Sequence, residues 1–247
     1  MALFGGIPVW LATMLERQLE EAGFKRTGKI AHRVTNRKID VLGVELIRKA
    51  LCSKWGLPYG SFTIEPACFL PFVPSLESAD FHCCRYTNTK LPSYLGCQIR
   101  FAVRTHIRQK EVSKAPNVWF VGQNSTPNEA VLRDVLEVLS EKVFPFFTHL
   151  DDLEGLLAYL QSGEDNIGKE GIWNIGKADS FRRLYLTGFT ALELGEWTLA
   201  ENSLDQCYET AISKSLNLRP EVLQCVKRAS SLAGQHLLLP YNHNSLH

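Results

Sequence analysis

The segment Cys97–Lys110 carries the side chains whose types and spacing most clearly suggest chemistry. Apolar residues occupy one parity of this segment and polar residues the other, as on a strand with one buried and one displayed face. The residues expected on the displayed face are Gln98, Arg100, Arg104, His106 and Arg108. Because arginine makes forked hydrogen bonds to carboxylates and phosphates, the pattern predicts docking of an acidic protein or a nucleic acid. The alternatives are a solvated face, or a face covered internally by acidic helices at 129–154.

A metal site is the second chemistry that the residue types allow. The candidate ligands are His82, Cys83, Cys84 and Cys97, all of which zinc accepts in a tetrahedral site. Adjacent cysteines seldom face one ion, and no C-x-x-C pair accompanies them, so thiols without a ligand are the favoured interpretation. We therefore expect no metal and no cofactor.

Trp173 is a third candidate, because it stands in the glycine-bearing segment 164–177. A large aromatic side chain on a loop often anchors in a pocket of a partner protein. It can equally pin the segment to the core, since such side chains are usually well buried. The sequence leaves both interpretations open.

The motifs of common catalytic sites are missing from the sequence. It contains no G-x-S-x-G or cysteine-centred nucleophile motif, and the glycines at 163–176 lack the strand, Lys-Ser/Thr and helix order of a P-loop. The seven cysteines, without a secretion signal, indicate reduced thiols in a cytoplasm. No segment approaches the roughly 18 to 20 apolar residues of a membrane span. We therefore expect a cytoplasmic protein that is not an enzyme and makes no membrane contact.

Hydrophobic periodicity indicates the elements that must position these residues. Strands are expected at Ile30–Val34, Ile39–Ile47, Ser61–Phe69, Gln98–Ile107 and Val118–Val121. Because no long helix separates these strands, an antiparallel sheet is favoured. Helices are expected at 8–22, 126–142, 179–194, 196–215 and 220–234. A further helix is expected to start at an N-terminal cap formed by Asp151 with Glu154.

These elements predict an α+β fold with an N-terminal helix, an antiparallel sheet of about five strands, flanking helices and a C-terminal helical bundle. The 247 residues are expected to form an α+β domain over 1–163, a linker over 164–178 and a helical domain over 179–247.

Several short runs in the first part of the chain match a known pattern. They are LEEAGFKRTGK at 19–29 ahead of a strand with Arg33, GSFTI at 60–64, VWF at 118–120, and FPFF at 144–147 ahead of LDDLE at 150–154. In these runs the chain resembles the bacterial domain of unknown function family 4304, over roughly residues 10–162. The resemblance implies an α+β fold and carries over no catalytic residue. Because members of that family often look like components of bacterial conflict loci, it also implies binding in preference to catalysis.

The charge of the chain is unevenly distributed. The formal net charge is +1, yet residues 1–114 hold 17 Lys and Arg against 9 Asp and Glu, while residues 115–247 hold 10 against 17. Such polarity favours fast and specific association with a charged partner. The leading prediction is therefore a protein-binding module, an immunity protein that neutralises a cognate bacterial toxin by occluding it. Its predicted partner-binding residues are Arg100, Arg104, His106, Arg108 and Trp173.

Two other functions stay open. The first alternative is a nucleic-acid-binding protein that uses the basic strand 98–108. The second is a cysteine- or metal-dependent enzyme.

Overall fold

The computed structural model describes residues 9–28, 30–74, 76, 91–106, 117–119, 128–162, 171–173 and 175–238. The chain divides into two compact units. The first comprises Met1–Leu70, Asn88–Asp151 and Gly168–Trp173, and the second comprises Pro71–Thr87, Asp152–Ile167 and Asn174–His247. The helix Leu153–Gln161 (α5) thus belongs to the second unit, and the range 164–178 contains a strand of the first, Gly171–Trp173 (β7).

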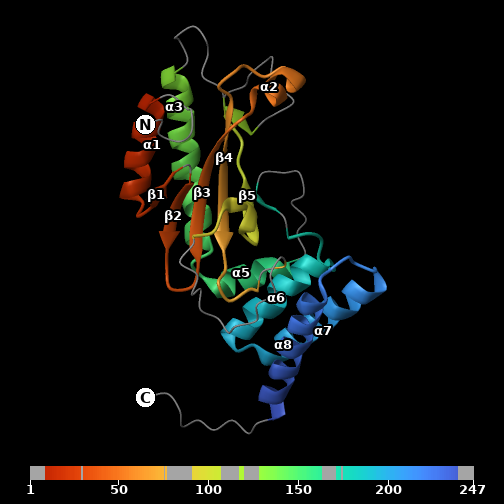
Figure 1. Ribbon diagram of the computed structural model, residues 1–247. Coiled ribbons are helices and arrows are strands. Elements are labelled where there is room, and N and C mark those ends of the chain that lie inside the picture. Colours follow the sequence, from red (N-terminus) through yellow and green to blue (C-terminus); the bar gives the residue numbers. More distant parts are fainter. Residues whose placement is uncertain are drawn as a thin grey trace. The chain divides into compact units, whose positions relative to one another are not determined.

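A seven-stranded sheet forms the centre of the first unit (Figure 1). The strands are β1 (Lys25–Thr27), β2 (Ile30–Val34), β3 (Ile39–Leu46), β4 (Phe62–Phe69), β5 (Ile99–Ala102), β6 (Val118–Trp119) and β7. Their order is β1-β2-β3-β4-β5-β7, with β6 paired to β4, and every pairing is antiparallel. The predicted α+β class and the antiparallel pairing are therefore confirmed, and β1 and β7 are strands that the periodicity did not indicate.

The helices of the first unit are α1 (Val9–Glu21), α2 (Lys49–Trp55), α3 (Asn128–Val138) and α4 (Phe144–His149), with a π-helical segment at Leu139–Val143 between α3 and α4. Helices α1 and α3 lie side by side along the sheet (Figure 1). The π-helical segment ends two residues before Pro145, whose missing N–H removes one i→i−4 hydrogen bond of a regular helix.

Aromatic rings join α4 to the sheet. Phe101 of β5 stacks on Phe146 at 4.5 Å between ring centroids, and Phe147 lies 5.4 Å from Phe24, just before β1. Such pairs add to the burial of large apolar side chains. The core of the first unit therefore holds α4 firmly against the strands.

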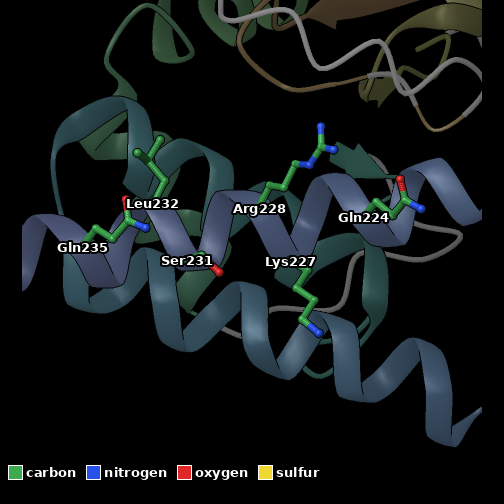
Figure 2. A pocket seen from close by; sticks show the side chains of 6 residues that line it. All are labelled: Gln224, Lys227, Arg228, Ser231, Leu232 and Gln235. Atoms are coloured by element: carbon green, nitrogen blue, oxygen red, sulfur yellow. The ribbon is translucent and has the colours of Figure 1, made fainter.

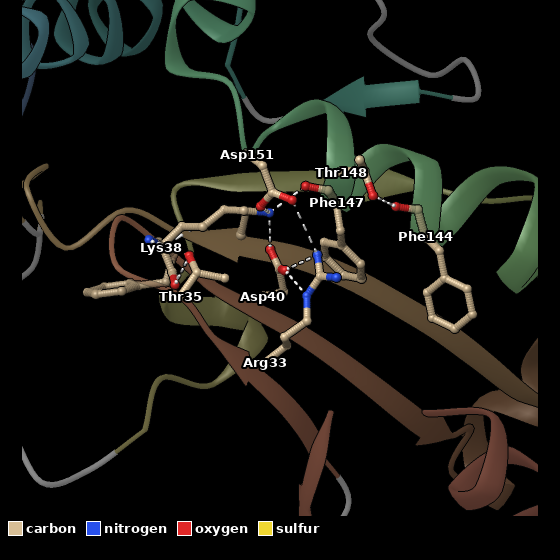
Figure 3. Close-up of polar contacts among 10 residues, drawn as sticks. Arg33, Thr35, Lys38, Asp40, Phe144, Phe147, Thr148 and Asp151 are labelled. Atoms are coloured by element: carbon tan, nitrogen blue, oxygen red, sulfur yellow. Dashed lines mark hydrogen bonds and ion pairs between the residues drawn. The ribbon is translucent and has the colours of Figure 1, made fainter. Parts of the chain in front are cut away.

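A buried network of charged side chains reinforces this contact (Figure 3). Lys38 is 1% exposed, and its Nζ donates hydrogen bonds to Asp40 at 2.6 Å and to the carbonyl of Phe147, and pairs with Asp151 at 2.9 Å. Arg33 Nε donates to the same Asp40 carboxylate at 2.8 Å. Burial raises the pKa of Asp40 by more than the two cations lower it. The network thus places two cations around one fully buried carboxylate.

The helices of the second unit, among the residues that the structure describes, are α5, α6 (Phe181–Leu194), α7 (Trp197–Ser213) and α8 (Pro220–Leu238). Helices α6, α7 and α8 pack on one another, and Gly188 permits a close approach to Leu204, where a Cβ would lie 2.6 Å from the leucine Cγ. Buried Arg183 donates to the carbonyl oxygens of Leu160 and Gly176. The expected helical bundle is therefore present.

The cap of α5 differs from the prediction. The side chain of Asp152, and not that of Asp151, accepts the hydrogen bond from the Glu154 N–H, at 3.1 Å. Asp151 instead pairs with Lys38. A tertiary ion pair therefore decides between two neighbouring residues that suit the cap equally well.

Candidate functional site

The basic segment forms a shorter strand than the sequence predicts. β5 ends at Ala102, and Arg104 follows it in irregular backbone. The prediction that Arg100 and Arg104 stand on one regular strand is therefore wrong. Arg108 lies outside the described residues.

Arg100 makes its contacts within the first unit. One guanidinium nitrogen donates to the carbonyl of Leu95 at 2.8 Å, and the group lies over the ring of Tyr94, 5.3 Å from its centroid. Burial raises the pKa of nearby Glu65, and the charge of Arg100 partly opposes that rise. Arg100 is therefore engaged by neighbouring residues of the first unit, and these contacts do not involve the acidic helices at 129–154.

Gln98 is also placed differently from the prediction. It was expected on the displayed face, but it is 8% exposed. Its side-chain amide accepts from the N–H of Leu70 at 2.9 Å and donates to the carbonyl of Leu70 at 3.2 Å. Gln98 therefore connects the end of β4 to the start of β5, and its side chain does not form part of a surface for a partner protein.

Asp134 of α3 holds the chain that leaves β5. Its carboxylate accepts hydrogen bonds from the Thr105 hydroxyl at 2.5 Å, the His106 N–H at 2.8 Å and the Trp119 indole at 2.6 Å. The carboxylate is buried, whereas the His106 side chain is 39% exposed. Capture by Asp134 accounts for the end of the strand, because the backbone turns toward α3 here.

The other predicted residues are distributed as follows. Trp173 lies in β7, where its backbone pairs with Arg100, and Arg104 is half-buried. Cys97 is buried, and burial raises the pKa of its thiol to about 12. His82, Cys83 and Cys84 lie outside the described residues. The partner-binding roles of Arg104, His106 and Trp173 stay predictions.

Helix α2, in the connection between β3 and β4, forms a surface that the sequence reasoning missed. Cys52 and Leu57 are buried beside Val118 and anchor one side of the helix. Gly56 ends the helix in the left-handed conformation, with φ at 68°, and the Leu57 N–H then bonds to the Cys52 carbonyl at 2.8 Å. These contacts fix the position of α2 and of the turn that follows it.

The exposed side chains in and next to α2 share their chemistry, and we call them the α2 surface: Arg48, Lys49, Leu51, Lys54, Trp55 and Tyr59. Trp55 is 55% exposed, Tyr59 52% and Leu51 36%. Exposed tryptophan and tyrosine next to arginine and lysine are unusual on a surface without a partner, because aromatic residues concentrate where proteins bind one another.

The charge of the α2 surface has one sign. Residues 48–60 include three basic residues and no acidic one. Within the described part of the chain, Arg48, Lys49 and Lys54 form no ion pair. The ammonium of Lys49 lies 5.9 Å from the centroid of the Tyr59 ring, and the Tyr59 hydroxyl meets the Ser53 hydroxyl at 3.3 Å. The aromatic ring is therefore positioned, and the three cations are available to an acidic group.

A second exposed face lies on α8 of the other unit. A hollow of about 460 Å³ is lined by Gln224, Lys227, Arg228, Ser231, Leu232 and Gln235. Figure 2 shows these side chains along the length of the helix. They recur at helical spacing and are all exposed, but Leu232 is the one aliphatic residue among them and none is aromatic. The α2 surface is the stronger candidate because it combines aromatic, aliphatic and cationic groups.

Comparison with known proteins adds no relative: the chain matches no family model, no curated protein and no solved structure. The resemblance to the unknown-function family 4304 therefore stays a prediction. Among the helices that the structure describes, none combines the length and apolar character needed to cross a bilayer.

The sequence did contain a signal for the α2 surface. The stretch between the two strongest predicted strands is too long for a tight hairpin. Within it, Leu51 and Trp55 stand four residues apart, as on one face of a helix turn, among lysines and an arginine. Only the structure shows that Cys52 and Leu57 are the buried residues and that Leu51 and Trp55 are not.

Proposed function

We propose that this chain is a non-enzymatic, cytoplasmic protein-binding module that docks an acidic partner protein on the α2 surface. In keeping with the resemblance to a family of bacterial conflict loci, the proposed partner is a toxin that the module occludes as an immunity protein. The single observation that carries the proposal is the exposed Trp55 and Tyr59 among three cations that lack an ion pair in the described part of the chain.

The chemistry of the α2 surface fits the centre of a protein interface. Tryptophan, tyrosine and arginine dominate the residues whose truncation costs most binding free energy. Leu51 and Trp55 supply apolar area that a partner can desolvate. Arg48, Lys49 and Lys54 surround it and favour carboxylates, which steer an acidic partner during encounter. A stable one-to-one complex buries on the order of 1,200–2,000 Å², so further contacts must surround these residues.

The five cysteines that the structure describes support a reducing compartment. Cys52, Cys68, Cys97, Cys207 and Cys225 are all free and buried. A cytoplasmic protein keeps thiols in this state.

Single-stranded nucleic acid is the second candidate, because bases stack on aromatic rings beside basic side chains. Trp55 and Tyr59 supply two such rings. A track for several nucleotides also needs a row of cations, and the row expected on one strand at 98–108 does not form, since β5 ends at Ala102. An acidic protein is therefore the better-supported partner.

The test uses the purified product of the adjacent gene, with binding measured by calorimetry and protection measured as survival of cells that express that product. We expect Trp55→Ala to weaken the complex about 30-fold or more, as for a residue at the centre of an interface. Because Trp55 is half-exposed, the midpoint of thermal unfolding of the Trp55→Ala variant should hardly differ from that of the wild type. Leu232→Ala, on the exposed face of α8, is the matched control and should bind like the wild type.

Three outcomes would count against the proposal: no binding to that product, no protection of the cells, or equal affinity of the Trp55→Ala variant. Retention on an oligothymidine matrix at low salt, lost steeply as salt rises, would instead favour nucleic acid.

A further inference from the structure

We propose that His106, Asp134 and Glu137 form a divalent metal site of zinc type, separate from the α2 surface. The site brings together one imidazole and two carboxylates. Asp134 and Glu137 stand three residues apart on α3, and His106 comes from the turn after β5. The function proposed above makes no use of these residues.

The distances between the ligand atoms suit one ion. His106 Nδ1 lies 3.5 Å from Asp134 Oδ1 and 4.0 Å from Glu137 Oε2, and all three ligand atoms lie within 4.8 Å of one another. Zinc bonds of about 2.0–2.2 Å in a tetrahedron separate neighbouring ligand atoms by roughly 3.3–3.6 Å. The imidazole and the buried carboxylate already stand at this separation. The exposed Glu137 side chain has the rotamer freedom to close the remaining gap.

Asp134 is oriented as a metal ligand must be. A carboxylate offers about four lone-pair positions. Asp134 Oδ2 accepts from Thr105 and Trp119, whereas Oδ1 accepts only the His106 N–H among the described residues. The open position of Oδ1 is on the atom nearest the His106 imidazole. Hydrogen bonds that fix a ligating carboxylate in this way are typical of metal sites.

The ligand set also selects the kind of metal. Calcium and magnesium prefer oxygen ligands throughout, whereas an imidazole favours zinc and its neighbours in the first transition row. Three protein ligands leave at least one position for water. The 39% exposure of His106 and 49% exposure of Glu137 let the ion enter from solvent.

The test is zinc titration of the full chain by calorimetry, in a buffer with a non-thiol reductant. His106→Ala keeps the backbone N–H that bonds to Asp134, and Glu137→Gln keeps the helix, so both variants should fold like the wild type. We expect each change to weaken zinc binding at least about tenfold, as loss of supporting groups alone does at known sites. His149→Ala, at the end of α4, and Glu129→Gln, in the first turn of α3, alter an exposed histidine and an exposed glutamate; they are the matched controls and should bind as the wild type does.

Cobalt substitution separates this site from the cysteines. Cobalt bound by nitrogen and oxygen lacks the thiolate charge-transfer absorption that sulfur ligation produces. Zinc affinity that is unchanged in both variants, the thiolate absorption at the first equivalent of cobalt, or a wild-type chain that binds no zinc would each overturn the proposal.

Discussion

Removal of the Asp134 carboxylate tests the account of how the chain after β5 is held. Asp134 is 4% exposed and accepts three hydrogen bonds, one of them from the indole of Trp119, which is fully buried. In Asp134→Ala the indole N–H loses its acceptor, and a buried unsatisfied donor costs about 1–3 kcal/mol. Thr105 is half-buried and His106 is exposed, so water can replace the carboxylate and each loses only the net value of a hydrogen bond, about 0.5–1.5 kcal/mol. The sum is about 2–6 kcal/mol of unfolding free energy.

Equilibrium urea unfolding followed by circular dichroism measures this loss, with a chelator present so that no metal contributes. Glu137→Gln, one turn further along α3, is the control and should stay within about 0.5 kcal/mol of the wild type. A second comparison uses Trp119→Phe, which removes the indole donor. Asp134→Ala should cost about 1 kcal/mol less in that background, because the buried indole N–H that would lose its acceptor is already absent.

An Asp134→Ala variant as stable as the wild type would contradict the role assigned to the Asp134 carboxylate. An equal cost of Asp134→Ala with and without the Trp119 indole would also contradict it. The first result would mean that water satisfies all three donors, and the second that the indole is not the donor that matters.

Two further predictions concern titration. Because the pKa of Asp40 is raised above its ordinary value of 3.8, the native state keeps a proton at a pH where the unfolded chain has released it. This protonation contributes its full stability below pH 3.8, and the contribution is lost as the pH rises through the pKa of Asp40 in the native state. The unfolding free energy of the wild type minus that of Asp40→Asn, from urea titrations at several pH values upward from about 4, should therefore shrink as pH rises, and a growing difference would contradict the cause assigned to the shift. Burial raises the pKa of Cys97 and of Cys225 to about 12, so at pH near 8 both thiols are protonated and shielded from reagents. Peptide mapping after iodoacetamide treatment should find them unmodified in the folded chain and modified in denaturant, and equal labelling in both states would show that they are accessible.

Elements with a strong local pattern could be predicted from the sequence. The predicted helix over 8–22 is α1 at Val9–Glu21, and the predicted strand Ile30–Val34 is β2 with the same bounds. The C-terminal helices were also found within a few residues. In each case apolar residues recur at the period of the element, so the signal lies within the segment itself.

Elements that depend on distant partners could not be predicted. β7 is three residues long and contains a glycine, and it exists through pairing with β5. The segment after Ala102 keeps the alternation of a strand, yet Asp134, about thirty residues later, turns it away. Alternation shows what a segment is able to form, and tertiary hydrogen bonds decide whether it does.

The candidate site was misplaced for the same reason. The alternation of arginines on one parity predicts that each of them faces solvent. The Arg100 guanidinium instead donates to the Leu95 carbonyl and lies over the Tyr94 ring. The α2 surface has fewer charges in a less regular pattern. Its outer residues become evident only when Cys52 and Leu57 are known to be buried.

The uneven charge of the chain can now be divided into an internal and an external part. Lys38 and Arg33 belong to the basic half, and one of their acidic partners, Asp151, belongs to the acidic half, so this share of the polarity is neutralised within the first unit. A buried carboxylate whose pKa is raised gives little net stability to that unit, because desolvation offsets the attraction of its partners. The value of the network therefore lies in fixing the turn after α4 against β3. The cations of the α2 surface have no such partner among the described residues, and they contribute positive charge that can attract another molecule.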